Sequence, residues 1–264
     1  MGLYFNKIFS RAAHGRDFIL DIIFPVSCIN CEAEGRWLCR ACSRKLQFSS
    51  SQYCLNCKKQ NIYGEFCDNC SAYYSLNGVW IAGDYEDKIL SELIKTLKYK
   101  FVNAIAGILG DYAAIFLANL IKINSNSSIN FIHPLKHGSP APNIFSNFSH
   151  SLIVPVPLHK QRLKWRGFNQ AQKIAEIVAN KLNLEIDSSN LIRIKRAKPQ
   201  AKINAAQRKK NIINCFQWQG KNLNQKNIIL FDDVATTGST LNECARILKN
   251  AGAKEIWGLA IAKG

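Results

Sequence analysis

Two carboxylates and a hydroxyl-rich turn adjoin each other near the end of the chain. Residues 227–241 read Asn-Ile-Ile-Leu-Phe-Asp-Asp-Val-Ala-Thr-Thr-Gly-Ser-Thr-Leu, so Asp232 and Asp233 follow an apolar run. In the turn, hydroxyls, free backbone N–H groups and a helix start favour an anion, and a glycine lets the backbone approach it closely. The predicted phosphate-binding residues are Thr236, Thr237, Gly238, Ser239 and Thr240. Carboxylates beside such a turn suit a ribose 5-phosphate, with its 2- and 3-hydroxyls on the acids. An acidic N-cap before an ordinary helix is the alternative.

Eight of the ten cysteines form four Cys-x-x-Cys pairs early in the chain. Two intervening residues let one turn place both thiolates on a metal, and four thiolates in tetrahedral geometry fit zinc. The predicted ligand sets are Cys28, Cys31, Cys39 and Cys42 for one ion, and Cys54, Cys57, Cys67 and Cys70 for the other. Cross-braced pairing and iron–sulfur binding are the alternatives. Such closed sites are structural, and the metal supplies much of the folding free energy.

Other residues of the cysteine-rich segment allow two interpretations. Its aromatic and basic side chains could pack around the metal or form a nucleic-acid surface; they are Arg36, Trp37, Tyr53, Lys58, Lys59 and Phe66. The isolated Cys215 and Cys244 are predicted to be buried as small apolar residues.

The elements that must position these groups follow from hydrophobic periodicity. Strands are predicted at 78–82, 152–156, 191–194, 211–218, 227–231 and 255–262, and helices at 87–99, 104–121, 171–182 and 240–250. Strands that alternate with helices indicate an α/β fold whose parallel sheet is covered on both faces. The acids then lie at the carboxyl end of a central strand, where such sheets bind ligands.

Composition shifts predict the domain organisation. Residues 1–24 form an amphipathic arm that packs on a neighbouring domain, with a membrane anchor as the alternative. Residues 25–75 form a small double zinc ribbon, and residues 76–264 form the α/β domain. Within that domain the polar, proline-containing stretch 124–150 is a flexible insertion.

Charge and hydropathy narrow the class of protein. The chain has 264 residues, 47% hydrophobic residues and a net charge of +17. This composition supports a folded core, and the charge attracts phosphates, nucleic acid or anionic membranes, unless it reflects compositional drift. The apolar run 18–24 is too short to span a bilayer. We therefore expect no transmembrane segment and a cytoplasmic protein whose reduced thiols bind metal.

The acid–turn string resembles the signature of type I phosphoribosyltransferases. Further segments are similar to the ComF family, whose amino-terminal double zinc ribbon the cysteine pairs match. They are Leu97-Lys-Tyr99, Val154-Pro-Val-Pro-Leu-His159, Arg162, Arg166-Gly-Phe-Asn-Gln170, Arg193, Pro199-Gln200, and Arg208 with Asn211. The resemblance implies a phosphoribosyltransferase fold and a role in competence, the uptake of DNA for transformation. Members are described as predicted amidophosphoribosyltransferases.

The resemblance also implies a ligand and residue roles. Phosphoribosyl pyrophosphate would bind with Mg²⁺, and a nitrogen nucleophile would displace the pyrophosphate. Basic residues expected at the pyrophosphate are Lys160, Arg162, Arg166, Arg193 and Arg208, unless they are solvated charge runs. Residues 193–210 match a loop that closes over substrate. Thr236 stands where some purine-specific relatives have an acid, so the acceptor is unnamed. The alternative function is a non-catalytic factor that binds single-stranded DNA and uses phosphoribosyl pyrophosphate as a regulator.

Overall fold

The computed structural model describes residues 26–99, 102–125, 148–195 and 211–264. The chain forms two compact units, Met1–Lys45 and Leu46–Gly264. The predicted arm 1–24, the core of the predicted insertion and Arg208 lie outside the described residues. The predicted division at residue 75 separates sequence motifs, whereas the compact units part after residue 45, so the second cysteine set belongs to the larger unit.

The smaller unit carries the first cysteine set on a short scaffold. An isolated bridge joins Ser27 to Glu34, and the helix α2 (Arg40–Ser43) begins at Cys39. With so little regular structure, the unit depends on its metal for a defined shape.

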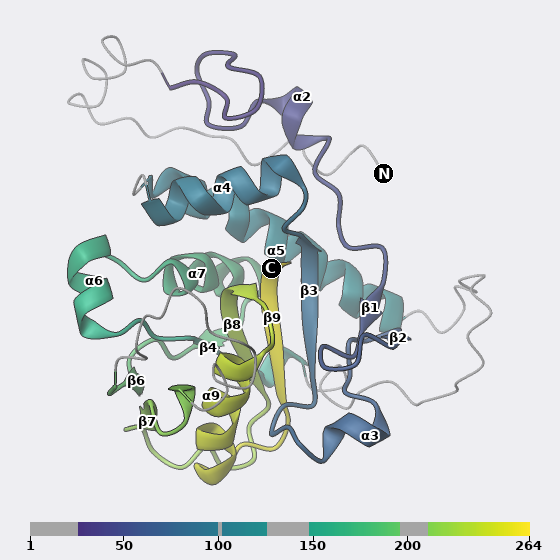
Figure 1. Ribbon diagram of the computed structural model, residues 1–264, viewed down its shortest axis with the longest axis vertical. Coiled ribbons are helices and arrows are strands. Elements are labelled where there is room, and N and C mark those ends of the chain that lie inside the picture. The colour runs from purple at the N-terminus through teal and green to yellow at the C-terminus, as the bar shows by residue number, and fades with distance from the viewer. Residues whose placement is uncertain (1–25, 100–101, 126–147, 196–210) are drawn as a thin grey trace. The chain divides into compact units, whose positions relative to one another are not determined.

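The larger unit begins with the second cysteine set and continues into a parallel sheet (Figure 1). The second set spans the antiparallel strands β1 (Gln52–Tyr53) and β2 (Gln60–Asn61) and the helix α3 (Asp68–Ser71). The sheet then contains five strands in the order β3-β9-β8-β4-β5, all parallel. Their bounds are β3 Gly78–Asp84, β4 Leu152–Pro155, β5 Glu185–Ile186, β8 Ile228–Ala235 and β9 Ile256–Lys263. The predicted α/β class with a parallel sheet is confirmed.

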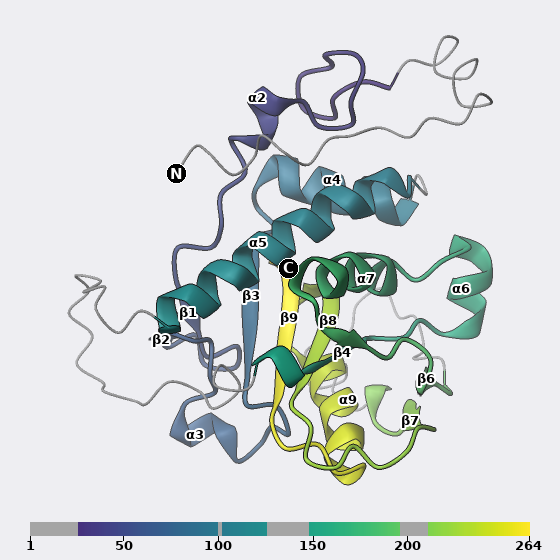
Figure 2. The same ribbon diagram turned by 180° about the vertical axis from the view of Figure 1, so that it is seen from behind.

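Helices cover both faces of this sheet, as Figure 2 shows from behind. The helices α5 (Ala104–Ser125) and α7 (Gln170–Leu182) lie on one face, and α9 (Ser239–Asn250) lies on the other. Strand side chains alternate between the faces, so Ile228 and Leu230 of β8 pack with Leu241 and Leu248 of α9. The second cysteine set joins the same apolar cluster through Leu55. The helix α4 (Lys88–Tyr99) precedes α5.

Three local predictions were wrong. The segment 160–166, for which no helix was predicted, forms the helix α6 (Lys160–Arg166). The predicted strand 211–218 is a strand only at β7 (Phe216–Trp218), because residues 211–214 form a helical turn that ends at Asn214 with a φ of 56°. The predicted strand at 191–194 does not join the parallel sheet, because β6 (Leu191–Arg193) pairs antiparallel with β7 in a separate two-stranded sheet.

A short 3-10 turn, η2 (Phe148–His150), precedes β4.

The helix α5 is unusually apolar. Residues 104–122 have a mean hydropathy of 1.8 and are long enough to cross a bilayer, the one such helix in the described part of the chain. A core helix has the same character, and α5 packs against α7 and buries Leu109 and Leu117 completely. Length and composition are therefore weak support for a span, and the expected absence of a transmembrane segment stays a prediction.

Close packing between α5 and α7 provides a test of this fold. A Cβ added at Gly110 would lie 2.6 Å from Ile177 Cγ2, whereas one at Gly107 would meet nothing within 4 Å. Both Gly→Ala changes favour the helix by roughly 1 kcal/mol. Overpacking costs about 1–3 kcal/mol, so Gly110→Ala should have the lower free energy of unfolding by about that amount. Urea unfolding of both variants measures it, and equal stabilities would contradict this helix packing.

Candidate active site and zinc ribbons

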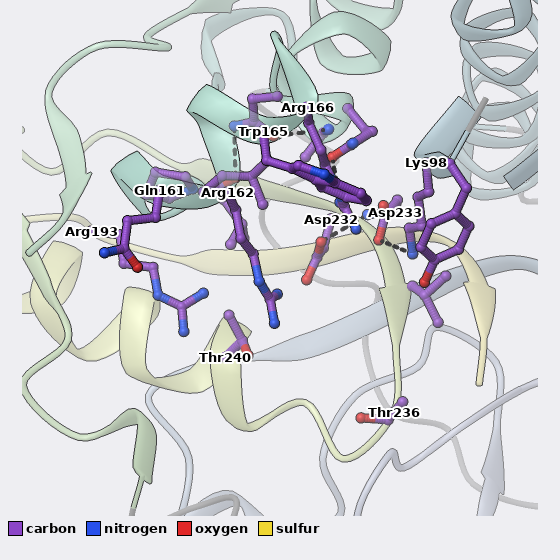
Figure 3. A pocket seen from close by; sticks show the side chains of 18 residues that line it. Lys98, Gln161, Arg162, Trp165, Arg166, Arg193, Asp232, Asp233, Thr236 and Thr240 are labelled. Carbon is purple, nitrogen blue, oxygen red and sulfur yellow. Dashed lines mark hydrogen bonds and ion pairs between the residues drawn. The ribbon is translucent and has the colours of Figure 1, made fainter. Parts of the chain in front are cut away.

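A pocket of about 680 Å³ opens at the carboxyl ends of β4 and β8 (Figure 3). From β4 the chain passes through α6 and α7 to β5 on one side, and from β8 it passes through α9 to β9 on the other. The loops therefore diverge between these two strands, and this divergence leaves the crevice in which α/β sheets bind ligands. Lining side chains used below are Lys98, Tyr99, Arg162, Trp165, Arg166, Asn169, Gln170, Arg193, Asp232, Asp233, Thr236 and Thr240.

The two acids lie within the carboxyl-terminal half of β8 rather than after it, and both line the pocket. Lys98 from α4 forms an ion pair with Asp233, with 3.0 Å between Nζ and Oδ1. Burial, together with the Asp233 carboxylate, raises the pKa of Asp232 to about 7, although Lys98 and Arg193 oppose the rise. Asp232 therefore exchanges its proton near neutral pH, and a cation or hydroxyl donor would stabilise its ionised form.

The predicted phosphate loop connects β8 to α9. Gly238 is buried with a φ of 69° and precedes the first turn of α9. The Thr237 and Ser239 hydroxyls are 2.8 Å apart and hydrogen-bond each other, so they order the turn. Thr236 and Thr240 line the pocket instead. The start of α9 and the hydroxyls of the two threonines that line the pocket together suit an anion.

Two arginines reach the pocket from α6. Gly167, with a φ of 75°, ends α6, and Asn169 begins α7 while its Nδ2 donates to the Val156 carbonyl at 3.0 Å. This short connection brings Arg162 and Arg166 to the pocket wall (Figure 3). The Arg166 Nη1 donates to Gln170 Oε1 at 3.0 Å, while the Gln170 Nε2 has no protein partner among the described residues.

Two exposed aromatic rings flank Arg166 at the pocket mouth. Trp165 and Tyr99 are 62% and 59% exposed. The guanidinium carbon of Arg166 is 5.9 Å and 5.8 Å from their respective ring centroids. Within this range the rings attract the cation, so they hold Arg166 at the mouth of the pocket.

A third arginine comes from the separate β6–β7 pair. The Arg193 guanidinium lies 5.2 Å from the Phe216 ring on the neighbouring strand. Burial and the nearby Arg162 lower the pKa of Arg193, which shows that the pocket concentrates positive charge. The turn before β7 is fixed by Glu243 of α9, whose Oε1 accepts from Asn214 N at 2.7 Å.

The structure gathers residues that are far apart in the sequence, but not the whole predicted set. Both acids, Thr236, Thr240, Arg162, Arg166 and Arg193 line the pocket, and Thr237, Gly238 and Ser239 shape its loop. Lys160 is exposed on α6 and takes no part in the wall formed by the described residues, so its predicted pyrophosphate role is not supported. Sequence reasoning gave no role to Lys98, Tyr99, Trp165 and Gln170. Segments similar to the ComF family did contain Lys98, Tyr99 and Gln170.

Each cysteine set forms a compact cluster whose four sulfurs lie within 4.8 Å of one another. The grouping is sequential, so the cross-braced alternative is wrong. Asn30 Nδ2 donates to Cys42 Sγ at 3.1 Å, and Asn56 Nδ2 donates to Cys70 Sγ at 3.2 Å. Such amide donors stabilise thiolates and orient metal ligands. The sulfurs therefore fit a tetrahedral ion with no further ligand position.

Burial decides the predictions for Cys215, Cys244 and Phe66. Cys215 and Cys244 are buried, as predicted. Phe66 is also buried and stacks on Tyr74, with 3.9 Å between ring centroids, so it packs near the metal and offers no nucleic-acid surface. Tyr53 is only half-buried, with the Lys263 Nζ 4.7 Å from its ring centroid.

Comparisons with known proteins match two separate segments of the chain to known domain families. A double zinc ribbon domain matches residues 19–71, and a phosphoribosyl transferase domain matches residues 169–262. Competence protein F of Haemophilus influenzae is 31% identical over 249 residues, which cover 90% of this chain and 98% of that protein. Competence protein ComFC of Bacillus subtilis is 27% identical over 81% of this chain and 79% of its own length. The DNA utilization protein YhgH of Escherichia coli is 34% identical over 40% of this chain and 47% of its own length. The two cysteine sets are therefore the sites of a double zinc ribbon.

The raised pKa of Asp232 predicts how stability depends on pH. The Asp232 carboxyl has a pKa of about 7 in the folded protein and about 3.9 in the unfolded chain. Its protonated form therefore stabilises the fold fully when the pH is below about 3.9. That stabilisation is lost as pH rises through about 7. Asp232→Asn removes the titration. The variant should therefore gain stability relative to the parent protein as pH rises from about 4 to about 7, with little further change above that pH, measured by urea unfolding. A pH-independent difference would contradict the assignment.

Proposed function

This chain belongs to the ComF family of competence proteins, and we propose that it binds phosphoribosyl pyrophosphate with Mg²⁺ and acts as a phosphoribosyltransferase in DNA uptake. One observation carries the proposal. A single pocket combines two carboxylates, a hydroxyl-rich helix start and three arginines from separate elements. The proposed location is the cytoplasm, where thiols stay reduced, and the proposed partners are other competence and uptake proteins.

The donor would occupy the pocket in one direction. Its 5-phosphate suits the turn at Thr236 and Thr240, where the start of α9 favours an anion. Its ribose hydroxyls suit Asp232 and Asp233 beside that turn. Its pyrophosphate then extends toward the arginines of α6 and β6, which supply bidentate donors to phosphate oxygens.

The residues also fit a magnesium ion. The Asp233 carboxylate opposes the ionisation of Asp232, and a hard divalent cation relieves such repulsion. These two side chains would hold the ion, which supplies positive charge to the pyrophosphate when bound.

The proposed reaction is a substitution at ribose C1. The bond from C1 to the pyrophosphate oxygen breaks, and its electron pair leaves with the pyrophosphate. A nitrogen lone pair forms the new C1–N bond, and the proton lost by that nitrogen passes to solvent. The arginines stabilise the developing negative charge and the acids position the ribose, so electrostatics and orientation provide the catalysis.

Calorimetric titration with phosphoribosyl pyrophosphate and Mg²⁺ tests donor binding. Asp232→Ala, Asp233→Ala and Arg193→Ala should each weaken binding about tenfold or more, because hydrogen bonds to charged groups contribute about 1.5–3 kcal/mol. Lys160→Ala is the matched control, since it removes a positive charge from an exposed residue of α6 that does not line the pocket. The control should bind nearly as the parent protein does.

No binding by the parent protein, or equal losses for Lys160→Ala and Arg193→Ala, would refute the ligand assignment. A pyrophosphate-release assay across amine and nucleobase acceptors then tests turnover. Binding without pyrophosphate release would favour a regulatory role for the ligand.

A second candidate function is binding of single-stranded DNA with phosphoribosyl pyrophosphate as the regulator. The exposed rings of Trp165 and Tyr99 beside Arg166 favour it, because exposed aromatics with cations stack on unpaired bases. A net charge of +17 would add attraction for the phosphate backbone.

Fluorescence anisotropy with a labelled oligothymidylate tests this second function. Affinity should fall steeply with salt, with a logarithmic slope of roughly 0.7 per phosphate contact. Trp165→Ala should weaken binding by about 1–3 kcal/mol through lost stacking. Tyr73→Ala, which removes another exposed ring, should have little effect. Absent or salt-insensitive binding would exclude DNA as a ligand.

A further inference from the structure

The second zinc ribbon contacts the phosphate loop directly. Leu55 stands between the ligands Cys54 and Cys57 and is only 2% exposed. A Cβ built on Gly238 would lie 2.6 Å from the Leu55 Cδ2. The leucine side chain therefore packs against the backbone of the loop at the residue that turns it.

This contact acts on the most constrained residue of the loop. Gly238 has a φ of 69°, in the left-handed region where residues with a Cβ are strained. Leu55 also occupies the space that a side chain there would need. The conformation that presents Thr236 and Thr240 to the pocket is thus supported from the ribbon side by one apolar side chain.

The ribbon is attached to the sheet edge and is not a free appendage. The Gln52 side chain is buried and bonds both backbone groups of Ile81 on β3, with Nε2 to the carbonyl at 3.0 Å and Oε1 to N–H at 2.9 Å. The Val79 N–H donates to the Gly64 carbonyl at 2.9 Å. Leu55 consequently belongs to a segment that hydrogen bonds attach to β3.

The ribbon also reaches the helix that starts at the loop. The backbone N–H of Ser75, which follows the last zinc ligand, donates to Asn242 Oδ1 in the first turn of α9 at 2.7 Å. The loop is therefore braced at Gly238 and, one turn later, at Asn242. Both braces originate in the segment that Cys54, Cys57, Cys67 and Cys70 organise.

The position of Leu55 depends on the metal-binding turn around it. The Cys54 N–H donates to the Lys59 carbonyl and the Lys58 N–H donates to the Cys54 carbonyl, at 2.8 and 2.9 Å. These bonds, together with one from Lys58 Nζ to the Leu55 carbonyl at 2.8 Å, close a turn that a zinc ion on Cys54 and Cys57 would fix further. Loss of a metal that joins all four cysteines should therefore loosen the turn that carries Leu55.

We propose that Leu55 is a positioning residue for the phosphate loop, so that zinc in the second ribbon sets the loop's affinity for a phosphorylated ligand. The inference rests on the proposed function, which places the 5-phosphate at this loop. Coupling between two binding sites is reciprocal. A bound ligand should therefore slow the loss of zinc from the second ribbon.

Variants of the full chain test the positioning role. Leu55→Ala should weaken phosphoribosyl pyrophosphate binding by about tenfold, which corresponds to about 1.4 kcal/mol, whereas Leu55→Met, which conserves volume, should restore most of it. Leu38→Ala is the matched control, because Leu38 is 4% exposed and precedes a zinc ligand of the other compact unit. The control should bind within about twofold of the parent protein.

Amide hydrogen exchange at residues 236–240 measures the loop without ligand. Leu55→Ala should exchange faster there than Leu38→Ala does. This measurement separates the two proposals: if the parent protein binds no phosphoribosyl pyrophosphate, the proposed function fails, and the exchange data alone decide the role of Leu55. Unchanged exchange with unchanged affinity would overturn the positioning role while the ligand site stands.

Zinc release from the parent protein gives a readout that needs no Leu55 variant. A chromogenic chelator should remove both ions from the free protein, and ribose 5-phosphate or phosphoribosyl pyrophosphate should slow the release of one. A Cys28→Ser, Cys31→Ser variant, which retains the second set, should keep the protected phase. Release that either ligand leaves unchanged, despite measured binding, would refute the coupling even if Leu55→Ala failed to fold.

Discussion

The parallel pairing of β4 with β8 is the constraint on which the candidate site depends. Residues 152–155 align with 228–231, so the two strands end at the same edge of the sheet. The chain leaves them in opposite directions, and the crevice between the departing loops cannot be closed by either one. The hydroxyl turn follows β8, and the arginine helix α6 follows β4. Without that pairing, the acids and arginines would have no common space.

The pocket is electrostatically asymmetric because its charges come from different elements. Positive side chains arrive from α4, α6 and β6, while both carboxylates come from one strand. The cost of burying Asp232 beside Asp233 is offset in part by Lys98 and Arg193. A ligand with phosphates at both ends and hydroxyls between them matches this distribution. Its binding would exclude water from these charges.

Local patterns predicted the regular elements better than their packing. Apolar runs identified the buried strands, the hydroxyl-rich turn identified a segment at the pocket, and the cysteine-rich turns identified the two sulfur clusters. Residues 211–214 were misjudged because their isoleucines favour a strand, whereas Asn214 turns the chain and bonds Glu243 of α9. Residues 160–166 were misjudged because a basic segment gives little sign of the short helix that Gly167 ends.

The sequence by itself determined the zinc ligands, the hydroxyl-rich turn after a buried strand and the α/β class, since each depends on the spacing of nearby residues. Only the tertiary structure decided which basic residues share the pocket with Asp232, because side chains that approach in space can be far apart along the chain. Lys98 of α4 lines the pocket and pairs with Asp233, whereas Lys160 is not among the described residues that line it. The tertiary structure also placed Leu55 of a zinc ribbon against Gly238, a contact between residues 183 positions apart (238 minus 55). No local pattern encodes that contact, because it arises from packing on the edge and face of the sheet.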